Sequence, residues 1–247
     1  MIKMMKPLSL MLLLCEVGFA GTMGELVVTN MRPFTTINAG AEFMHAGESQ
    51  RVSIIGPIGN YYTVNKSYQS SGLLGVAAGI ETSAGSGFIW QLGIVGYYNS
   101  KVKARGDVWE FGLPEYDDFT YSYTIQSKRL MATGKLLVTY EQRFHPYLSA
   151  DLGVGFNRAS NYREIPLLTE VISTTYFSNT TTSSFAWGAG LGVDTDISNR
   201  FRLGIGYQFE DLGKVSLGPS LVQVGSGSLH SSHQYGQQVR LQLSAFI

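Results

Sequence analysis

The chain has 247 residues with 18 Lys+Arg against 18 Asp+Glu, so its formal net charge is zero, and only 15% of its positions are charged. A large basic surface for nucleic acid is therefore not expected, and 1 Cys is too few for a disulfide scaffold or a cysteine-rich zinc site. With 44% hydrophobic residues, 29 Gly and 7 Pro, the chain has enough apolar surface to bury a core.

Residues 1–20 have the order of a secretory signal peptide. Lys3 and Lys6 precede an apolar stretch that ends at Leu14, and small residues lead to Ala20. This stretch is too short to span a bilayer, and after residue 20 no apolar run reaches the ~18–20 residues that a membrane-spanning helix needs. We therefore predict an exported protein whose signal peptide lies outside the fold, followed by a periplasmic N-terminal segment at 21–33.

From residue 34 onward, apolar residues alternate with polar or small ones, which is the pattern of strands whose two faces have different surroundings. Within Phe201–Phe209, for example, every odd position is large and apolar, whereas the even positions are Arg, Gly, Gly and Gln. This alternation predicts eight strands, at 34–45, 71–82, 88–99, 122–140, 146–157, 184–195, 201–210 and 234–247.

The connections between these strands alternate strictly in length. Those at 83–87, 141–145 and 196–200 are short, whereas those at 46–70, 100–121, 158–183 and 211–233 are long. A soluble β-sandwich would not favour one end in this way, but bacterial outer-membrane barrels do. Because hydrocarbon offers no hydrogen-bond partners, a membrane sheet must close on itself. We predict an all-β domain at 34–247, an eight-stranded antiparallel up-and-down transmembrane β-barrel with short periplasmic turns and long extracellular loops.

The direction of the side chains follows from the cost of placing charge in lipid. A basic residue near the bilayer midplane costs about 2–4 kcal/mol, so Arg202 and its even-numbered neighbours are predicted to face the lumen. Counting from the strand ends predicts three ion pairs in the lumen: Lys135 with Asp151, Asp194 with Arg202, and Glu42 with Arg240. These charges suit either a polar gate or, as we favour, a structural network that fills the lumen.

Aromatic residues lie towards the ends of the apolar faces, where a membrane barrel carries its girdles. Glycines such as Gly153, Gly190 and Gly204 lie on the opposite face and leave space near the axis. Because an eight-stranded barrel is only just wide enough for its own side chains, we predict a blocked or very narrow lumen. The predicted girdle residues are Trp90, Tyr98, Tyr140, Trp187, Phe201, Phe209 and Tyr235.

The segments Ala186–Asp194 and Asn199–Phe209 resemble the penultimate hairpin of small bacterial outer-membrane barrels of the OmpA-like, opacity-protein type. The start at Gly21–Gly24 is similar to that of related gammaproteobacterial surface proteins, and Tyr235–Ile247 is similar to the final strand that the barrel assembly machinery reads. The resemblance implies residence in the outer membrane of a Gram-negative bacterium but no particular activity, since such barrels serve as adhesins, anchors, small channels and a few enzymes. It also implies a C-terminal assembly signal at Tyr235, Val239, Leu241, Leu243, Phe246 and Ile247, although the family pattern ends in an aromatic residue.

Little in the sequence indicates catalysis. The 4 histidines form no recognised zinc spacing, so we predict no metal and no other cofactor. The segment from His230 to His233 is similar to that of barrel lipid A deacylases, which use Ser, His and Glu. However, His233 replaces the Asn of that family, and no Glu or Asp follows Asp211, so we predict that the protein is not an enzyme.

The long connections carry Tyr, Ser and apolar stretches such as Val52–Ile55 and Ile165–Leu168. They suit recognition, or else they extend the strands beyond the membrane and pack on each other. We therefore predict a structural or surface-interaction protein of the outer membrane, with a narrow porin-like channel as the alternative and a lipid-A-active enzyme as the third reading. The predicted partners are outer-membrane lipids and lipopolysaccharide, the barrel assembly machinery and an extracellular or host ligand, but no nucleic acid.

Overall fold

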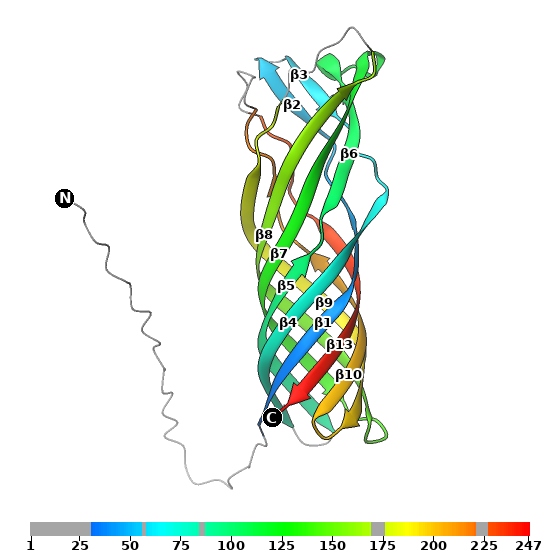
Figure 1. The fold of residues 1–247 in the computed structure, drawn as a ribbon, viewed down its shortest axis with the longest axis vertical. Coiled ribbons are helices and arrows are strands. Elements are labelled where there is room, and N and C mark those ends of the chain that lie inside the picture. Colours follow the sequence, from blue (N-terminus) through cyan, green and yellow to red (C-terminus); the bar gives the residue numbers. More distant parts are fainter. Residues whose placement is uncertain (1–30, 56–57, 84–86, 169–175, 221–226) are drawn as a thin grey trace, which may run out of the picture.

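A computed structural model describes residues 31–55, 58–83, 87–168, 176–220 and 227–247. The predicted signal peptide and most of the predicted N-terminal segment lie outside these residues. Eight antiparallel strands form a closed ring in the order β1-β4-β5-β7-β8-β9-β10-β13, which the pairing of β13 with β1 completes (Figure 1). The ring strands are β1 (Arg32–His45), β4 (Tyr68–Ser83), β5 (Phe88–Asn99), β7 (Asp117–Val138), β8 (Phe144–Pro166), β9 (Thr180–Ser198), β10 (Phe201–Asp211) and β13 (Tyr235–Phe246).

This ring confirms the predicted fold class and all eight predicted strands. The C-terminus and the short connections lie at one end of the barrel, and the long connections lie at the other (Figure 1). Neighbouring strands pair along most of their length, so the backbone groups of the ring satisfy one another, as a sheet in hydrocarbon requires. In the described part of the chain, no helix is long and apolar enough to cross a bilayer.

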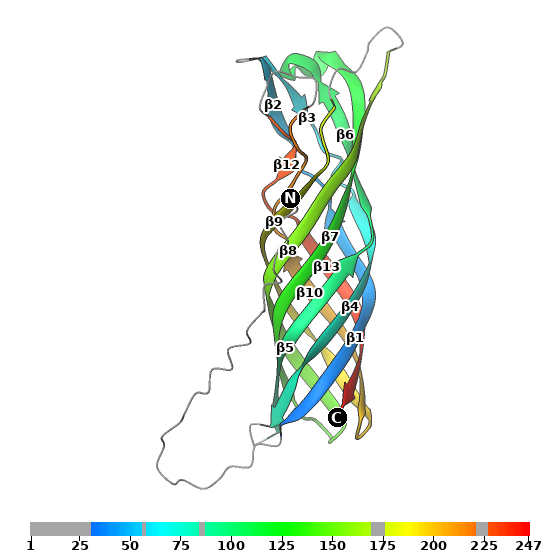
Figure 2. The ribbon, with the colours of Figure 1, turned by 60° about the vertical axis from the view of Figure 1, so that its left-hand side comes forward.

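The four long connections contain more regular structure than we predicted. β7 and β8 continue well past their predicted ends, and β6 pairs with the upper part of β7 (Figure 2). β3 in turn pairs with both β2 and β6, which widens the wall at this end. The additional elements are β2 (Gln50–Ile55), β3 (Ile58–Tyr62), β6 (Val102–Trp109), β11 (Val215–Ser216), β12 (His230–Ser231) and two short 3₁₀ helices, η1 (Glu110–Gly112) and η2 (Pro114–Tyr116).

The lower part of the barrel carries its apolar side chains on the outside. On β8, Leu148 and Leu152 are 63% and 56% exposed, and on β10, Ile205 is 55% exposed. Their neighbours Asp151 and Arg202 face inward and are buried, which confirms the predicted direction of the side chains. A continuous apolar belt of this kind is unfavourable in water and is the surface that a barrel presents to lipid.

Further up, the polarity of the two faces reverses although the side-chain direction does not. On β7, the inward positions are charged at Arg129 but apolar above it at Ile125, while the outward positions change from Leu130 to Lys128. On β8, the outward positions change in the same way above Phe156, which lies opposite Lys128. This level therefore marks the outer edge of the apolar belt, and the part of the molecule beyond it, including β2, β3, β6, η1, η2, β11 and β12, is called the crown.

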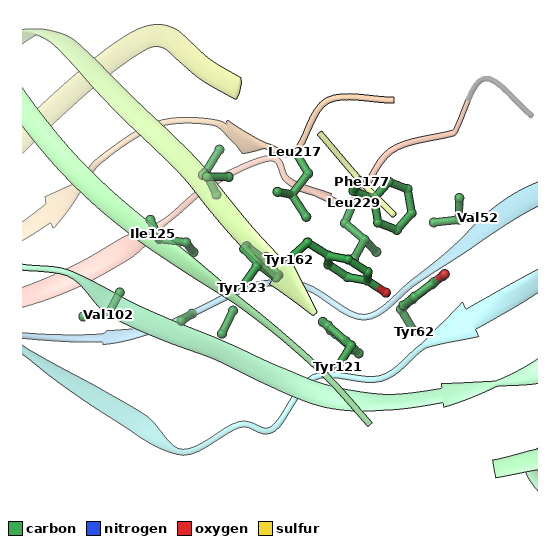
Figure 3. Close-up of a cluster of buried hydrophobic side chains, with 14 of the residues drawn as sticks. Val52, Tyr62, Val102, Tyr121, Tyr123, Ile125, Tyr162, Phe177, Leu217 and Leu229 are labelled. Atoms are coloured by element: carbon green, nitrogen blue, oxygen red, sulfur yellow. The ribbon is translucent and has the colours of Figure 1, made fainter. Parts of the chain in front are cut away.

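The crown has its own hydrophobic core. Phe177 packs edge-on against Tyr162, with ring centroids 4.9 Å apart, and Tyr62 packs in the same way against Tyr121 at 5.4 Å (Figure 3). These residues come from segments far apart in the sequence, so the core ties the long connections together. Further buried members are Met44, Val52, Val102, Val108, Phe119, Tyr123, Ile125, Leu212, Val215, Leu217 and Leu229.

Candidate functional site

The lumen of the lower barrel holds all six of the predicted charged residues, but in different pairs from those predicted. Lys135 pairs with Asp194 at 2.8 Å, not with Asp151. Arg202 pairs with Glu81 at 2.6 Å and with Asp196 at 2.7 Å, not with Asp194. The third predicted pair, Glu42 with Arg240, is also wrong. Glu42 lies 3.5 Å from Arg129, and Arg240 lies 3.8 Å from Asp151.

The strand register explains why all three predicted pairs are wrong. Lys135 lies opposite Ser149, which is two residues from the predicted partner Asp151. Arg202 lies opposite Asp196 because β9 continues to Ser198, so the turn to β10 is shorter than the predicted 196–200, and Arg240 lies opposite Gly40, two residues from Glu42. Each count from the strand ends was therefore two residues off. In a narrow tilted ring, long side chains also reach across the axis to strands that are not neighbours.

Besides its ion pair with Asp194, Lys135 contacts a layer of polar and aromatic groups near the short-turn end. Its ammonium donates a hydrogen bond of 2.9 Å to Gln242 and lies 3.8 Å from the centre of the Tyr147 ring. The amide of Gln242 donates to the Tyr147 hydroxyl at 2.7 Å. The ammonium thus has charged, polar and aromatic partners, which is what a buried cation requires.

An upper layer of the lumen brings Glu42 and Glu210 together with Arg129, which we did not predict there. The Arg129 guanidinium forms a hydrogen-bonded ion pair with Glu210 and donates to the Asn99 side chain at 2.9 Å. Arg129, Glu210 and Glu42 are all buried. The signal was present, because Arg129 has the same odd parity on its strand as Lys135, and Glu210 has the same even parity as Arg202.

The middle of the lumen is filled by side chains that reach the axis from opposite walls. Gln208 donates a hydrogen bond of 2.7 Å to Asp151, and Arg240 donates to the hydroxyl of Tyr97. Inward glycines provide the room for these groups, and a Cβ at Gly206 or Gly192 would collide with the Tyr147 ring or hydroxyl. A cavity between these layers, lined in part by Tyr97 and Arg240, has a volume of only about 30 Å³, far below the roughly 300–1,000 Å³ of a ligand pocket.

The predicted girdle residues fall into two groups. Trp90, Tyr140 and Phe201 lie towards the short-turn end of the belt, and Tyr98 lies at its outer edge, opposite Lys128. Trp187, Phe209 and Tyr235 also lie towards the outer edge, where Phe209 stacks on Tyr235 at 5.7 Å between ring centroids and packs at a tilt against Trp187 at 5.8 Å. Both groups lie on the outward face, where a barrel carries its interfacial aromatic residues.

The residues of the predicted assembly signal do not share one face. Tyr235, Val239, Leu241 and Leu243 face outward on β13 and are 44–56% exposed. Phe246 instead faces inward, where it packs on Phe34 with ring centroids 6.3 Å apart and the Arg202 guanidinium lies over its ring. Ile247 follows the strand and is 89% exposed.

The segment from His230 to His233 lies in the crown and makes structural contacts. The Ser231 hydroxyl donates to the carbonyl of His233, and the carbonyl of His230 accepts a hydrogen bond from the Gln50 amide. The Glu48 carboxylate accepts a hydrogen bond from the backbone N–H of Ser232. Glu48 is distant in sequence, so the structure places beside this segment a carboxylate that we did not predict. Within the described ranges, no histidine is hydrogen-bonded to a serine hydroxyl, and no three His, Cys, Asp or Glu residues are grouped as a metal site.

The other two histidines also have structural partners. His45 packs on Tyr68 with ring centroids 3.9 Å apart, and His145 lies 2.8 Å from Asp196 near the short-turn end. His233 pairs with Asp211 at 2.7 Å and stacks on Tyr235, so its imidazole lies beside the outer girdle. Among the described residues, the Ser231 hydroxyl is bonded to the carbonyl of His233 and not to its imidazole.

The crown tyrosines are held in an environment that favours their neutral form. Burial raises the pKa of Tyr121 and of Tyr123 well above the usual range, because the phenolate would lose its hydration. Burial likewise raises the pKa of Tyr162, whose hydroxyl donates a hydrogen bond of 2.7 Å to Glu164. The described interior of the crown is thus closed by neutral, largely apolar contacts, whereas the lumen of the barrel below it is closed by ion pairs.

No protein-family model matches the chain, and no curated protein matches it in sequence. Similar solved structures include Neisserial surface protein A, with 10% identity and a TM-score of 0.45 over 87% of this chain and 96% of that one. Outer membrane protein OprG from Pseudomonas aeruginosa has 12% identity and a TM-score of 0.48 over 85% and 95% of the two chains. The outer membrane protease OmpT from Escherichia coli has 9% identity and a TM-score of 0.38 over 92% and 99%. The fold assignment rests on the strand pairing of this chain itself.

Proposed function

We propose that this protein resides in the outer membrane of a Gram-negative bacterium, where it acts as a closed scaffold that presents the crown at the cell surface. The observation that carries this proposal is the combination of a filled lumen with a crown that has its own hydrophobic core. A channel needs a continuous aqueous path, whereas the cavity lined by Arg240 and Lys135 in the described lumen has a volume of only about 30 Å³. A rigid crown, in contrast, is a suitable base for surface recognition.

The top of the crown presents apolar side chains to water. Phe111, Leu113 and Tyr116, on and between η1 and η2, are 47–53% exposed, and Leu167 and Leu168, which directly follow β8, are 55–57% exposed. A hydrogen bond from the Leu167 amide to the Asp118 carbonyl holds the two groups of residues near each other. We call these five residues the tip. Exposed apolar patches on a rigid surface are characteristic of interaction sites, which supports a role in surface interaction over a purely structural one.

Bilayer conductance tests the closed lumen. We expect purified, refolded protein to insert into planar bilayers without stepwise currents. Insertion is checked by electrophoresis without boiling, since a folded barrel migrates differently from an unfolded one. Stepwise currents from the wild-type protein that change on Lys135→Ala or Arg202→Ala would refute the proposal in favour of a narrow pore.

Adherence tests the tip. Bacteria that display the wild-type protein should adhere to immobilised extracellular-matrix proteins more strongly than bacteria that display the Phe111→Ser, Leu113→Ser variant. Lys214→Gln, an exposed crown change away from the tip, is the matched control and should adhere like the wild type. Equal adherence of all three strains at equal surface levels would leave the protein with a structural role only.

A further inference from the structure

The outer wall of the crown carries a row of basic side chains on one side of the molecule. Lys101 precedes β6, Lys103 and Arg105 project outward from β6, Lys128 projects from β7, and Arg158 and Arg163 project from β8; all six are exposed. These strands are neighbours in the sheet, so the six residues form one surface, which we call the basic wall. Within the described residues, none of the six has a carboxylate within ion-pair distance.

The strand register gives the height of each charge above the apolar belt. Lys128 lies opposite Tyr98 and Phe156, at the outer edge of the belt, and Arg158 lies opposite Gln126, two residues higher. Arg105 and Arg163 both lie opposite Ser122, six residues above Lys128. At about 3.4 Å per residue and a tilt of about 35–45°, the charges extend from the edge of the belt to roughly 15 Å above it.

The basic wall also contains a groove that suits an anion. The groove has a volume of about 360 Å³ and is lined by Lys103, Arg105, Thr120 and Ser122, among others. The two cations can pair with an anionic oxygen, and the two hydroxyls can donate hydrogen bonds to it. The only carboxylate in the lining is Asp107, which lies two residues above Arg105 and thus farther from the membrane.

The other side of the barrel lacks this feature at the same height. The outward positions directly above the belt are Gly72 and Ser70 on β4, and Ser183 and Thr181 on β9. The charge is therefore directed to one side and does not form a uniform ring around the barrel. The basic side chains project laterally from the outer wall, towards the molecules that surround the barrel at this height. They do not project upward from the tip.

We infer that the basic wall binds the phosphate groups of an outer-leaflet glycolipid whose acyl chains lie against the apolar belt below it. This inference rests on the proposed outer-membrane location and adds a specific lipid site to it. A phosphorylated glycolipid matches both the sign of the charge and its spread, because its phosphates lie above its acyl chains. A soluble polyanion would match the sign alone, since it has no reason to bind next to the belt.

The test measures retention of lipid A by the folded barrel. Wild-type protein is incorporated into phosphatidylcholine vesicles that contain either bisphosphorylated or dephosphorylated lipid A, extracted in mild detergent, and examined by native mass spectrometry. We expect the phosphorylated lipid to be retained and the dephosphorylated one to be lost. Each Lys or Arg near an anionic surface contributes about a factor of five in affinity, so Lys103→Gln, Arg105→Gln, Arg163→Gln should bind roughly a hundredfold more weakly.

A matched triple variant keeps the same net charge change. Arg51→Gln, Arg200→Gln, Lys214→Gln removes three exposed cations outside the basic wall and should retain the lipid as the wild type does. If the first triple variant does not fold, the pair Lys128→Gln, Arg158→Gln at the edge of the belt replaces it.

Three outcomes would overturn the inference. They are equal retention of both lipids, equal loss in the two triple variants, and displacement of the lipid by a soluble sulfated polysaccharide that binds the barrel equally well without vesicles. Failure of the wild-type protein to insert into vesicles, seen by gel mobility without boiling, would instead refute the outer-membrane location.

Discussion

The most informative single change is Arg129→Met, because this arginine is the only cation within 4 Å of two buried carboxylates in the described upper lumen. Its guanidinium is paired with Glu210, lies 3.5 Å from Glu42 and donates a hydrogen bond of 2.9 Å to Asn99. Met keeps much of the side-chain volume but removes the charge and all of its donors. The two carboxylates would then face each other without a counter-ion, in a layer where both are 0% exposed.

The size of the effect follows from this geometry. Removing one partner of a buried ion pair costs about 3–5 kcal/mol, mainly because a buried charge loses its partner. Arg129 serves two carboxylates, so we expect the free energy of unfolding to fall by about 4 kcal/mol or slightly more. Adding Glu210→Gln to Arg129→Met removes one of the unpaired charges and should restore about 2 kcal/mol, a coupling typical of residues in one network.

Urea unfolding in lipid vesicles measures this difference, with Trp fluorescence and gel mobility without boiling as independent probes. Lys214→Met is the control, since an exposed crown residue should change the stability by less than about 0.5 kcal/mol. A loss below about 1 kcal/mol for Arg129→Met would show that the upper layer does not depend on this ion pair. A double variant as unstable as the single variant would refute the explanation by unpaired carboxylates.

Three further predictions concern the lumen and the crown. Gly192→Ala places a Cβ 2.3 Å from a neighbouring carbonyl oxygen and should destabilise the barrel by about 1–3 kcal/mol in the same urea assay, whereas Gly134→Ala, with its nearest neighbour at 3.5 Å, should be tolerated. Phe177→Ala should lower the stability of the crown by about 3–5 kcal/mol and expose new sites to surface proteolysis. The gel mobility of the unboiled, folded barrel should stay unchanged. Because burial raises the pKa of Tyr121 and Tyr162 in the folded crown, the stability that they contribute is present below the unfolded pKa of about 10 and is lost as the pH rises above it. Near-UV circular dichroism should therefore show the crown loosening above about pH 10, and a signal that stays constant there would contradict the burial of these phenols.

The barrel was predictable because the bilayer imposes a simple rule on its strands. Each strand in hydrocarbon must carry apolar side chains on its outward face and small or polar ones on its inward face. The period-two pattern of a segment such as Phe201–Phe209 is therefore almost sufficient to identify it as a barrel strand. The crown strands obey the same period with the opposite polarity. Val102, Ala104 and Val108 alternate with charged residues on β6, yet the prediction placed this segment in the long connection 100–121.

The ion pairs were less predictable than the strands. The parity of a residue determines whether it enters the lumen, and for Lys135 and Arg202 the sequence was sufficient for that step. The choice of partner depends on the register, and the alternation of residues does not show that β9 continues to Ser198 and leaves a turn of only 199–200 before β10. It also depends on reach across the axis, which is why Arg202 finds Glu81 on a strand that is not its neighbour.

The reversal of polarity along β7 and β8 links the fold to the proposed role. The same inward face that is closed by charges at Arg129 is closed by apolar rings at Tyr121, and the change occurs where the outward face leaves the belt at Lys128. Inside the membrane, the barrel wall needs an apolar exterior, so its polar groups can only gather in the lumen. In water the exterior is free to be polar, so the apolar groups gather inside and hold the crown together. The crown is thus a soluble-type core built directly on the barrel, and the described side chains that it leaves for recognition lie on its outer wall and its tip.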